Sequence, residues 1–331
     1  MIVRIFVTLV LWIAIATPGM AADDPATAAA RQLGRGINVL GYDGLWDGGV
    51  DAPFRFRNFR RIREAGFQHV RINFHAFRYM NADGIVDPVV LAALDDAVTA
   101  TIAAGLIPVI DEHNSDECVT DVPRCKNLLI AFWQQIANRY RGKYPSAMFE
   151  ILNEPGAPMT FAAWNEIVSA VLATIRSLDR TRLVIVAALN SQDPEDLQTL
   201  RLPEDDRHII LTVHYYKPFA FTHQGAPWIP NGPKAGQSWG SATDIAALTR
   251  DFAAVDRWAK AQRRPVYLGE FGVYEAAAMA ERTRYMSAIV RAAEQLNWPW
   301  AAWQFDHDFA VFDTDRDRWH APLLKALIEA H

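Results

Sequence analysis

The chain has 331 residues, of which 51% are hydrophobic and 21% are charged, and its formal net charge is -5. This is ordinary globular composition, and the length suits about two average domains or one closed α/β barrel. No basic cluster is present, so the sequence excludes nucleic acid as an expected partner. Nothing in the sequence predicts an oligomer, and we expect a monomer.

Residues 1–22 have the features of a cleavable signal peptide. Arg4 supplies a short positive region, IFVTLVLWIAIA is an apolar run, and small residues near Ala21 and Ala22 fit a cleavage site. The alternative is an uncleaved membrane anchor, but the run is shorter than the ~20 residues that a membrane span needs. We therefore expect a periplasmic or secreted protein without stable membrane association, with residues 23–331 as its one domain.

Cys118 and Cys125 are the two cysteines, in the segment CVTDVPRC. Export places them in an oxidising compartment, which favours a disulfide between them over two free thiols. Their spacing fits no common zinc pattern, and two cysteines alone do not make a metal site.

After the leader, short apolar segments alternate with segments whose apolar residues recur at helical spacing. Asp87 can cap the helix that follows it, and Pro88 is a favoured first helical residue. Helices are predicted at 53–66, 88–104, 129–140, 161–178, 245–255, 279–296 and 322–330, with a weak one near 194–200. Strands are predicted at 36–42, 67–74, 106–114, 147–155, 182–190, 208–216, 265–274 and 298–306.

Eight strands that alternate with helices predict a parallel sheet, and eight such units in one chain fit a single-domain (β/α)8 barrel. A doubly wound open sheet is the alternative. It is disfavoured because GINVLG, at the first strand, is not the glycine-rich phosphate loop G-x-G-x-x-G.

Polar residues gather where a barrel would place its catalytic groups, at the C-terminal ends of the strands. Two of them, Glu154 and Glu270, end the fourth and seventh strands, which face each other across a small barrel. Two carboxylates across a cleft suggest cleavage of a glycosidic bond. Neighbouring donors on Arg71, His214 and Tyr216 would favour a charged Glu270, whereas for Glu154 only Asn153 stands nearby in the sequence.

These motifs resemble those of glycoside hydrolase family 5, the cellulase family of retaining (β/α)8 glycosidases, from about Gly36 to the last helix. ILNEP resembles the acid/base motif of the family, and LGEFG resembles its nucleophile motif. The resemblance implies that Glu154 is the acid/base catalyst, that Glu270 is the nucleophile and that Asn153 holds the sugar 2-hydroxyl. It implies no cofactor and no catalytic metal.

VRINF, DEHN, HYY and WQFD resemble further motifs of the family. Asn114 stands where many cellulases carry a second histidine, and the loop at 223–239 is long, so the substrate subtype stays open. The resemblance implies supporting or substrate-binding roles for Arg71, His113, Asn114, His214, Tyr216 and Trp303.

The resulting prediction is an exported retaining β-glycanase that hydrolyses internal β-1,4-glucosidic bonds by double displacement. In that case the two carboxyl groups should lie about 5–5.5 Å apart. The alternatives are another β-glycan as substrate (mannan, mixed-linkage glucan or a bacterial exopolysaccharide) or a catalytically silent glycan-binding protein.

Further tryptophans are candidate sugar platforms, because the apolar faces of sugar rings stack on aromatic rings. Trp46, Trp228 and Trp239 fall in loops expected on the same face of the barrel as Trp303, with plain loop packing as the alternative. Glu150 is expected to fill a polar layer inside the barrel. The remaining histidines that we expect at the surface or in loops are His75, His208, His223 and His307.

Overall fold

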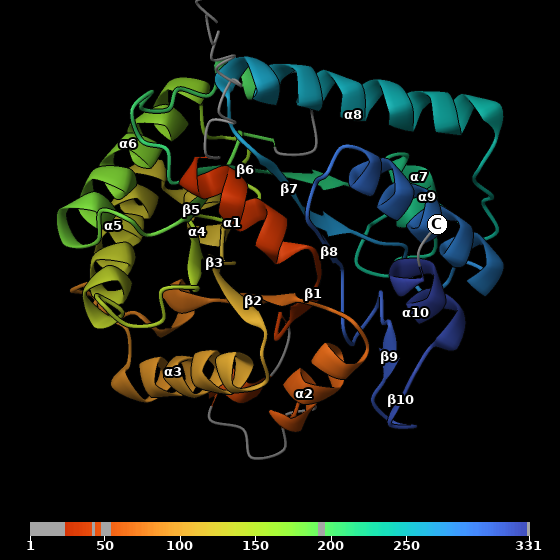
Figure 1. Cartoon of the computed structure of the whole chain (residues 1–331), viewed down its shortest axis with the longest axis horizontal. Helices are drawn as coiled ribbons and strands as arrows, with labels where there is room; N and C mark the ends of the chain where they lie inside the picture. Colours follow the sequence, from red (N-terminus) through yellow and green to blue (C-terminus); the bar gives the residue numbers. More distant parts are fainter. Residues whose placement is uncertain (1–23, 42–43, 48–53, 191–195, 330–331) are drawn as a thin grey trace, which may run out of the picture.

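The structure, a computed structural model, describes residues 24–41, 44–47, 54–190 and 196–329, so the predicted signal peptide lies outside the described residues. Eight parallel strands close into a barrel in sequence order (Figure 1). The prediction of a single-domain (β/α)8 barrel is therefore confirmed. The strands are β1 (Arg35–Val39), β2 (His69–Phe74), β3 (Ile107–Glu112), β4 (Met148–Glu150), β5 (Val184–Ala187), β6 (Ile209–Tyr215), β7 (Val266–Phe271) and β8 (Trp300–Ala302).

Helices surround the strands, and most lie where helical spacing predicts them. The helix predicted near 194–200 is only a 3-10 turn, η3 (Asp196–Thr199). The principal helices are α2 (Arg57–Glu64), α3 (Pro88–Ala103), α5 (Val122–Arg139), α6 (Phe161–Leu178), α8 (Ala242–Gln262), α9 (Met279–Gln295) and α10 (Ala321–Ile328). Elements that the sequence did not indicate are α1 (Pro25–Leu33), α4 (Asp116–Thr120), α7 (Phe219–Thr222), η1 (Gly44–Asp47), η2 (Ala76–Tyr79), β9 (Phe312–Asp313) and β10 (Arg318–Trp319).

Short polar residues fix where several helices begin. The Asp87 side chain accepts a hydrogen bond from the backbone N–H of Val89, as expected for the start of α3. At α8, Ser241 and Asp244 form a reciprocal capping box, in which each side chain accepts from the backbone N–H of the other residue. Such caps satisfy N–H groups that have no partner within the helix, and each contributes about 1 kcal/mol.

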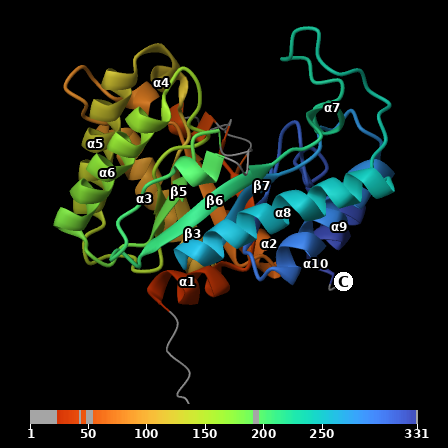
Figure 2. The same cartoon turned by 90° about the horizontal axis from the view of Figure 1, so that it is seen from above.

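The interior of the barrel changes from apolar at one end to charged at the other. Helix α1 covers the N-terminal ends of the strands, and its Ala30 and Leu33 pack against Val109 and Tyr267 from inside the barrel. Figure 2 shows α1 at one end of the barrel, while the segment around α7 extends from the opposite end. The open end, where the strands terminate, is therefore free to hold polar side chains.

The segment after β3 is tied to the barrel by its cysteines. The structure joins Cys118 of α4 to Cys125 of α5 in a disulfide, with the two Cα atoms 4.8 Å apart. Both residues are buried, so the bridge anchors the loop that follows one of the site-bearing strands. Among the helices of the described ranges, none combines the length and the apolar character that crossing a membrane would require.

Candidate active site

A cavity of about 390 Å³ opens at the C-terminal ends of the strands. It combines carboxylates, histidines and aromatic rings that come from loops and strand ends far apart in the sequence. Its lining is His113, Asn153, Glu154, Tyr216, Phe219, His223, Trp228, Ile229, Glu270, Trp303, Asp308 and Phe309.

The two predicted glutamates meet in this cavity. One carboxylate oxygen of Glu154, one of Glu270 and a ring nitrogen of His214 all lie within 4.8 Å of one another. Hydrogen bonding along β6 and β7 shifts register between Val213 and His214, which places His214 opposite Glu270. The ends of β4 and β7 therefore face each other, as the sequence suggested. Their two carboxyl groups lie on opposite sides of one small cavity.

Glu270 is held by donors on two sides. Nη1 of Arg71 donates to Oε1 of Glu270 at 2.6 Å, and the hydroxyl of Tyr216 donates to Oε2 at 2.9 Å. The residue is only 4% exposed. Hydrogen bonds from a guanidinium and a phenol favour the ionised form of a carboxylate, so this position suits a group that must be negatively charged.

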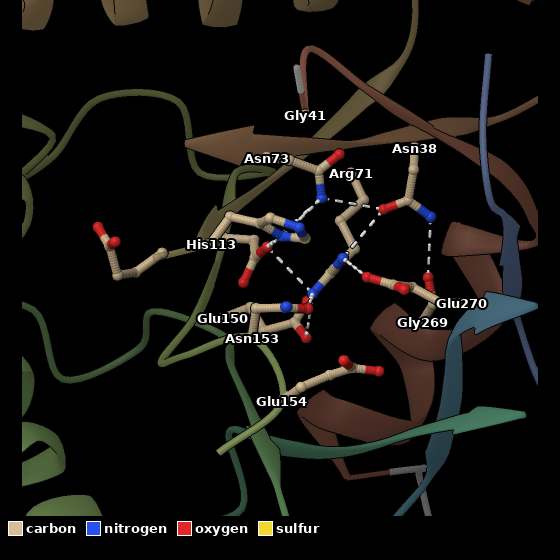
Figure 3. Close-up of polar contacts among 12 residues, drawn as sticks. Asn38, Gly41, Arg71, Asn73, His113, Glu150, Asn153, Glu154, Gly269 and Glu270 are labelled. Atoms are coloured by element: carbon tan, nitrogen blue, oxygen red, sulfur yellow. Dashed lines mark hydrogen bonds and ion pairs between the residues drawn. The ribbon is translucent and has the colours of Figure 1, made fainter. Parts of the chain in front are cut away.

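Beside Glu270, the fully buried Arg71 also contacts Glu150 (Figure 3) and a second carboxylate, that of Asp111. Its Nε and Nη2 donate to the two oxygens of Glu150 at 2.7 and 3.0 Å, and Nη2 lies 3.0 Å from Oδ2 of Asp111. Burial by itself lowers the pKa of Arg71, but the charges of Asp111, Glu150 and Glu270 outweigh it and raise the pKa above its ordinary range. Arg71 is therefore a permanent cation under the site.

Glu154 occupies a more open position on the other side of the cavity. It follows β4 with a φ of 40°, in the left-handed region, and its side chain is 36% exposed. Nδ1 of His214 lies 2.9 Å from Oε1 of Glu154 but 3.6 Å from Glu270. His214 therefore lies beside both carboxylates, as expected, and its ring nitrogen is nearer to Glu154 than to Glu270.

The charge of His214 follows from these neighbours. Burial lowers the pKa of His214, but the charge of Glu270 and the hydrogen bond to Glu154 outweigh that effect and raise the pKa above its ordinary value. His214 thus carries a proton over a wider pH range than a free histidine, and it contacts both carboxylates while doing so.

His113 and Trp303 form the wall beside these groups. Their rings are stacked, with centroids 5.4 Å apart and planes inclined by 9°. Burial, followed by the charge of Arg71, lowers the pKa of His113 to about 4, so the ring is neutral at neutral pH. Its Nδ1 lies 2.7 Å from Oδ2 of Asp111, so Nδ1 carries the proton and Nε2 remains a hydrogen-bond acceptor.

Of the two asparagines predicted for the site, only Asn153 lines the cavity. Its Oδ1 accepts from Nη2 of Arg71 at 3.0 Å, which orients the amide. Asn114 does not line the cavity; its Oδ1 instead accepts from the backbone N–H of Asp116. The structure therefore gives Asn114 the role of capping the loop after β3, and our placement of it in the cleft was wrong.

The predicted tryptophan platforms divide into two groups. Trp228 lines the cavity, is 47% exposed and packs edge-on against Tyr274 at 4.9 Å. Trp46 and Trp239 are buried and, unlike Trp303 and Trp228, do not line the cavity, so neither offers a ring face to a sugar there. Trp46 instead donates from its indole N–H to the carbonyl of Leu40, and Trp239 packs against aromatic side chains beneath its loop. For these two, the platform interpretation was wrong.

Several cavity residues escaped the sequence analysis. His223 and His75 both lie in loops, as expected; His223 lines the cavity, whereas His75 is buried, with its Nε2 2.6 Å from the carbonyl of Gly41. Phe219 and Ile229 lie in the segment after β6, and only the length of that segment marked it. The acidic lining residue Asp308 follows Trp303 closely and carried no separate signal.

A (β/α)8 barrel with two facing carboxylates in a cavity at its C-terminal end defines a glycoside hydrolase. The chain belongs to glycosyl hydrolase family 5, the cellulase family, whose model matches residues 46–308.

Named relatives agree with this assignment. Endoglucanase H of Acetivibrio thermocellus is 28% identical over 90% of this chain, but the chain spans only 33% of that relative's length. Cellodextrinase A of Ruminococcus flavefaciens is 26% identical over 78% of this chain and 82% of its own length. A solved structure of Thermotoga maritima Cel5A in complex with cellobiose is similar at a TM-score of 0.85 and 34% identity, over 92% of this chain and 100% of that one.

Proposed function

We propose that this chain is an endo-β-1,4-glucanase that works with retention of configuration, with Glu270 as nucleophile and Glu154 as acid/base catalyst. The observation that carries the proposal is the approach of the two carboxylates to within 4.8 Å. Retaining glycosidases have carboxyl groups about 5–5.5 Å apart, whereas inverting enzymes need about 6.5–9.5 Å to admit a water molecule.

The surroundings of the two glutamates support this division of roles. A nucleophile must be ionised, and Glu270 accepts hydrogen bonds from Arg71 and Tyr216. An acid/base catalyst must exchange its proton with substrate and water, and Glu154 is the more exposed of the two, with a 36% exposed side chain. The two glutamates thus have different surroundings in one cavity: Glu270 is buried among hydrogen-bond donors, and Glu154 is partly exposed.

In the first step, Glu270 attacks the anomeric carbon while Glu154 gives its proton to the departing glycosidic oxygen. The bond to the leaving sugar breaks, and a glycosyl ester forms on Glu270. In the second step, Glu154 takes a proton from water, whose oxygen attacks the same carbon and releases Glu270. Two inversions give net retention.

Residues around the carboxylates would orient the sugar. Asn153 is held by Arg71 and faces the cavity, where it can bind the 2-hydroxyl. Nε2 of neutral His113 can accept from a sugar hydroxyl, and Trp303 and Trp228 offer rings for stacking.

The named relatives support β-1,4-glucan as the substrate, since they are endoglucanases and a cellodextrinase and one solved relative holds cellobiose. A second candidate is β-mannan, because another structure of Thermotoga maritima Cel5A, 34% identical to this chain, is in complex with mannotriose. Both substrates require the same catalytic pair. Initial rates on soluble cellulose derivatives, mannan, mixed-linkage glucan and a bacterial exopolysaccharide, compared at equal enzyme concentration, would rank them.

We also propose that the protein is exported after removal of residues 1–22 and acts as a monomer. The leader-like composition and the Cys118–Cys125 pair, which suits an oxidising compartment, support export. Mass spectrometry of the periplasmic protein would give the first residue and the state of the thiols, and gel filtration with light scattering would give the mass in solution.

Azide rescue tests the catalytic roles. Without its nucleophile, Glu270→Ala leaves space for azide to attack the opposite face, which gives an inverted glycosyl azide. Without its acid/base group, Glu154→Ala still forms the ester from an activated aryl glycoside, and azide then releases it with retention. Nuclear magnetic resonance identifies each anomer. Swapped outcomes would reverse the two roles, and full activity of both variants on polymer would refute the proposal.

A further inference from the structure

Glu150 lies outside the cavity lining, yet it is bound to the group that holds Glu270. It is fully buried at the end of β4, four residues before Glu154. Both of its carboxylate oxygens accept from Arg71, at 2.7 and 3.0 Å (Figure 3). Burial raises the pKa of Glu150, while the charge of Arg71 and its hydrogen bonds act in the opposite direction. Because each oxygen accepts an N–H of the guanidinium, the two-point contact favours the ionised form of Glu150.

The two-point contact fixes the direction in which Arg71 points. A guanidinium is planar, so holding Nε and Nη2 against Glu150 leaves Nη1 directed toward Glu270, at 2.6 Å, and toward Oδ1 of Asn38, at 3.0 Å. Asn38 in turn donates to the backbone carbonyl of Gly269, the residue before Glu270. The position of the Glu270 carboxylate is therefore determined through Arg71 by a residue on another strand.

One cation is shared among carboxylates from three strands. Arg71 lies within 3.0 Å of Asp111 on β3, Glu150 on β4 and Glu270 on β7. Their side chains are 0%, 0% and 5% exposed, so water screens these charges weakly. The negative charges of Glu150 and Asp111 therefore offset part of the positive potential that Arg71 exerts on Glu270.

We propose that Glu150 is a positioning residue that, through Arg71, sets the orientation and the basicity of Glu270. The inference rests on the proposed role of Glu270 as nucleophile. The proposal predicts the direction of the effect, because neutralising Glu150 makes the electrostatic potential at Glu270 more positive. Glu270 then stays ionised to lower pH, attacks the sugar more weakly and leaves the glycosyl ester more readily.

Other titratable groups also face Arg71 and Glu270, and they must stay unchanged in the test. His214 on β6 and Glu154 after β4 border Glu270 from above, and Tyr216 donates to it. Tyr267 on β7 lies below, and burial raises its pKa well above the ordinary value, so it remains neutral. His113 is bound to Asp111 and is neutral near pH 7, since its pKa is lowered to about 4.

The experiment compares wild type with Glu150→Gln, which keeps the shape and removes the charge. The substrates are aryl cellobiosides with activated leaving groups. We expect the acidic limb of the pH profile of kcat/KM to move to lower pH by about one unit. At the optimum, kcat/KM, which reports ester formation, should fall about tenfold, while kcat, which for such substrates reports ester hydrolysis, should not fall.

Glu112→Gln is the matched control, because Glu112 is equally buried on the neighbouring strand but accepts from the backbone N–H groups of Ala76 and Asn114. It should leave the limb in place. Asp111→Asn, which removes a second carboxylate from Arg71, should move the limb in the same direction as Glu150→Gln and decides the matter if Glu150→Gln does not fold. A lower melting temperature with an unmoved limb, or equal falls in kcat and kcat/KM, would overturn the proposal.

Failure of this inference is distinguishable from failure of the proposed function. Azide rescue of Glu270→Ala tests the nucleophile without reference to Glu150. If that variant yields the inverted azide while Glu150→Gln leaves the limb in place, the nucleophile stands and the positioning role falls. If Glu270→Ala keeps its activity on polymer, the assignment of the nucleophile falls with it.

Discussion

The two sides of the cavity differ in how firmly they hold their carboxylate. On the closed side, Glu270 is 4% exposed and rests on Arg71, which is itself enclosed by buried carboxylates. On the open side, Glu154 has a 36% exposed side chain and borders the long segment that carries His223 and Trp228. The closed side is built from strands and the open side from loops.

This difference matches what each proposed role requires. A nucleophile gains from a fixed position, because a displacement of about 1 Å can cost about 100-fold in rate. An acid/base catalyst must reach both the leaving sugar and water, which a partly exposed side chain allows. Changes to the closed side should therefore act on chemistry and stability together, while changes to cavity-lining residues of the open side other than Glu154 should act on substrate binding alone.

Arg71→Met should have the largest effect, because it removes the shared cation and leaves buried carboxylates unpaired. We expect kcat/KM to fall by about 10³-fold and the free energy of unfolding to fall by about 3–5 kcal/mol. Steady-state kinetics and urea unfolding measure the two effects. Arg182→Met is the control, since Arg182 is also buried but donates to carbonyls such as those of Tyr144 and Ala147, away from the cavity. It should lose stability only, and an equal loss of kcat/KM would contradict the comparison.

Gly269→Ala should come next, because a side chain has no room there. A Cβ on Gly269 would lie 2.6 Å from Oγ1 of Thr212 and 3.0 Å from Nε2 of His214. We expect His214 to be displaced from both carboxylates and kcat/KM to fall by about 100-fold. Gly156→Ala, on the open side, would meet only ordinary contacts at 3.6 Å and beyond, and its kcat/KM should stay near wild type. Similar losses of kcat/KM in both variants would show that the two sides of the cavity tolerate an added side chain equally well.

Acid should destabilise the closed side through His69 at the base of the barrel. Nδ1 of His69 lies 2.8 Å from the carbonyl of Leu33 on α1, and Nε2 lies 3.0 Å from the hydroxyl of Tyr267. Burial lowers the pKa of His69 to about 4 from its ordinary 6.5. Between about pH 6.5 and pH 4, His69 therefore binds a proton in the unfolded chain but not in the folded chain. Its contribution to the free energy of unfolding is fully present above about pH 6.5 and falls as the pH drops toward 4.

The expected loss from this residue is about 2 kcal/mol at pH 5, which corresponds to about one and a half pKa units. Urea unfolding at pH 7 and pH 5 measures it. His69→Gln cannot take up the proton, so its stability should drop less between the two pH values, even if it is lower at pH 7. Equal drops in wild type and variant would remove His69 as the cause.

The closed side was also the side that the sequence predicted best. Strand alternation and the position of polar residues at strand ends were enough to pair Glu154 with Glu270 and to place Arg71 beneath them. The closer approach of His214 to Glu154 than to Glu270 was not predicted, because the choice between two neighbouring carboxylates depends on side-chain orientation, which a hydrophobic pattern does not show. Glu150 was placed in a polar layer, but its two-point contact with Arg71 depends on side chains from separate strands.

The open side was predicted poorly because loops have no period. Trp46, Trp228 and Trp239 share the same local signal, an aromatic residue in a polar loop. Whether such a ring faces the cavity or packs beneath the loop depends on tertiary contacts, such as those of Trp239 with Tyr285 at 5.0 Å. His223 was missed for the same reason, since only the folded segment brings it to the cavity.

The smallest expected effect separates the two loop tryptophans. Trp228→Ala removes an exposed ring from the cavity wall, so KM for long oligosaccharides should rise by about five- to tenfold, in line with about 1 kcal/mol for one stacking contact. The free energy of unfolding and kcat should stay near wild type, because the ring is 47% exposed and has no assigned part in the chemical steps. Trp239→Ala should do the reverse, since removing a buried ring costs about 3–5 kcal/mol in unfolding free energy while the folded fraction keeps its KM. Kinetics on oligosaccharides of increasing length, together with urea unfolding of both variants, test the pair. If Trp239→Ala raises KM and Trp228→Ala does not, the open wall lies elsewhere than the structure places it.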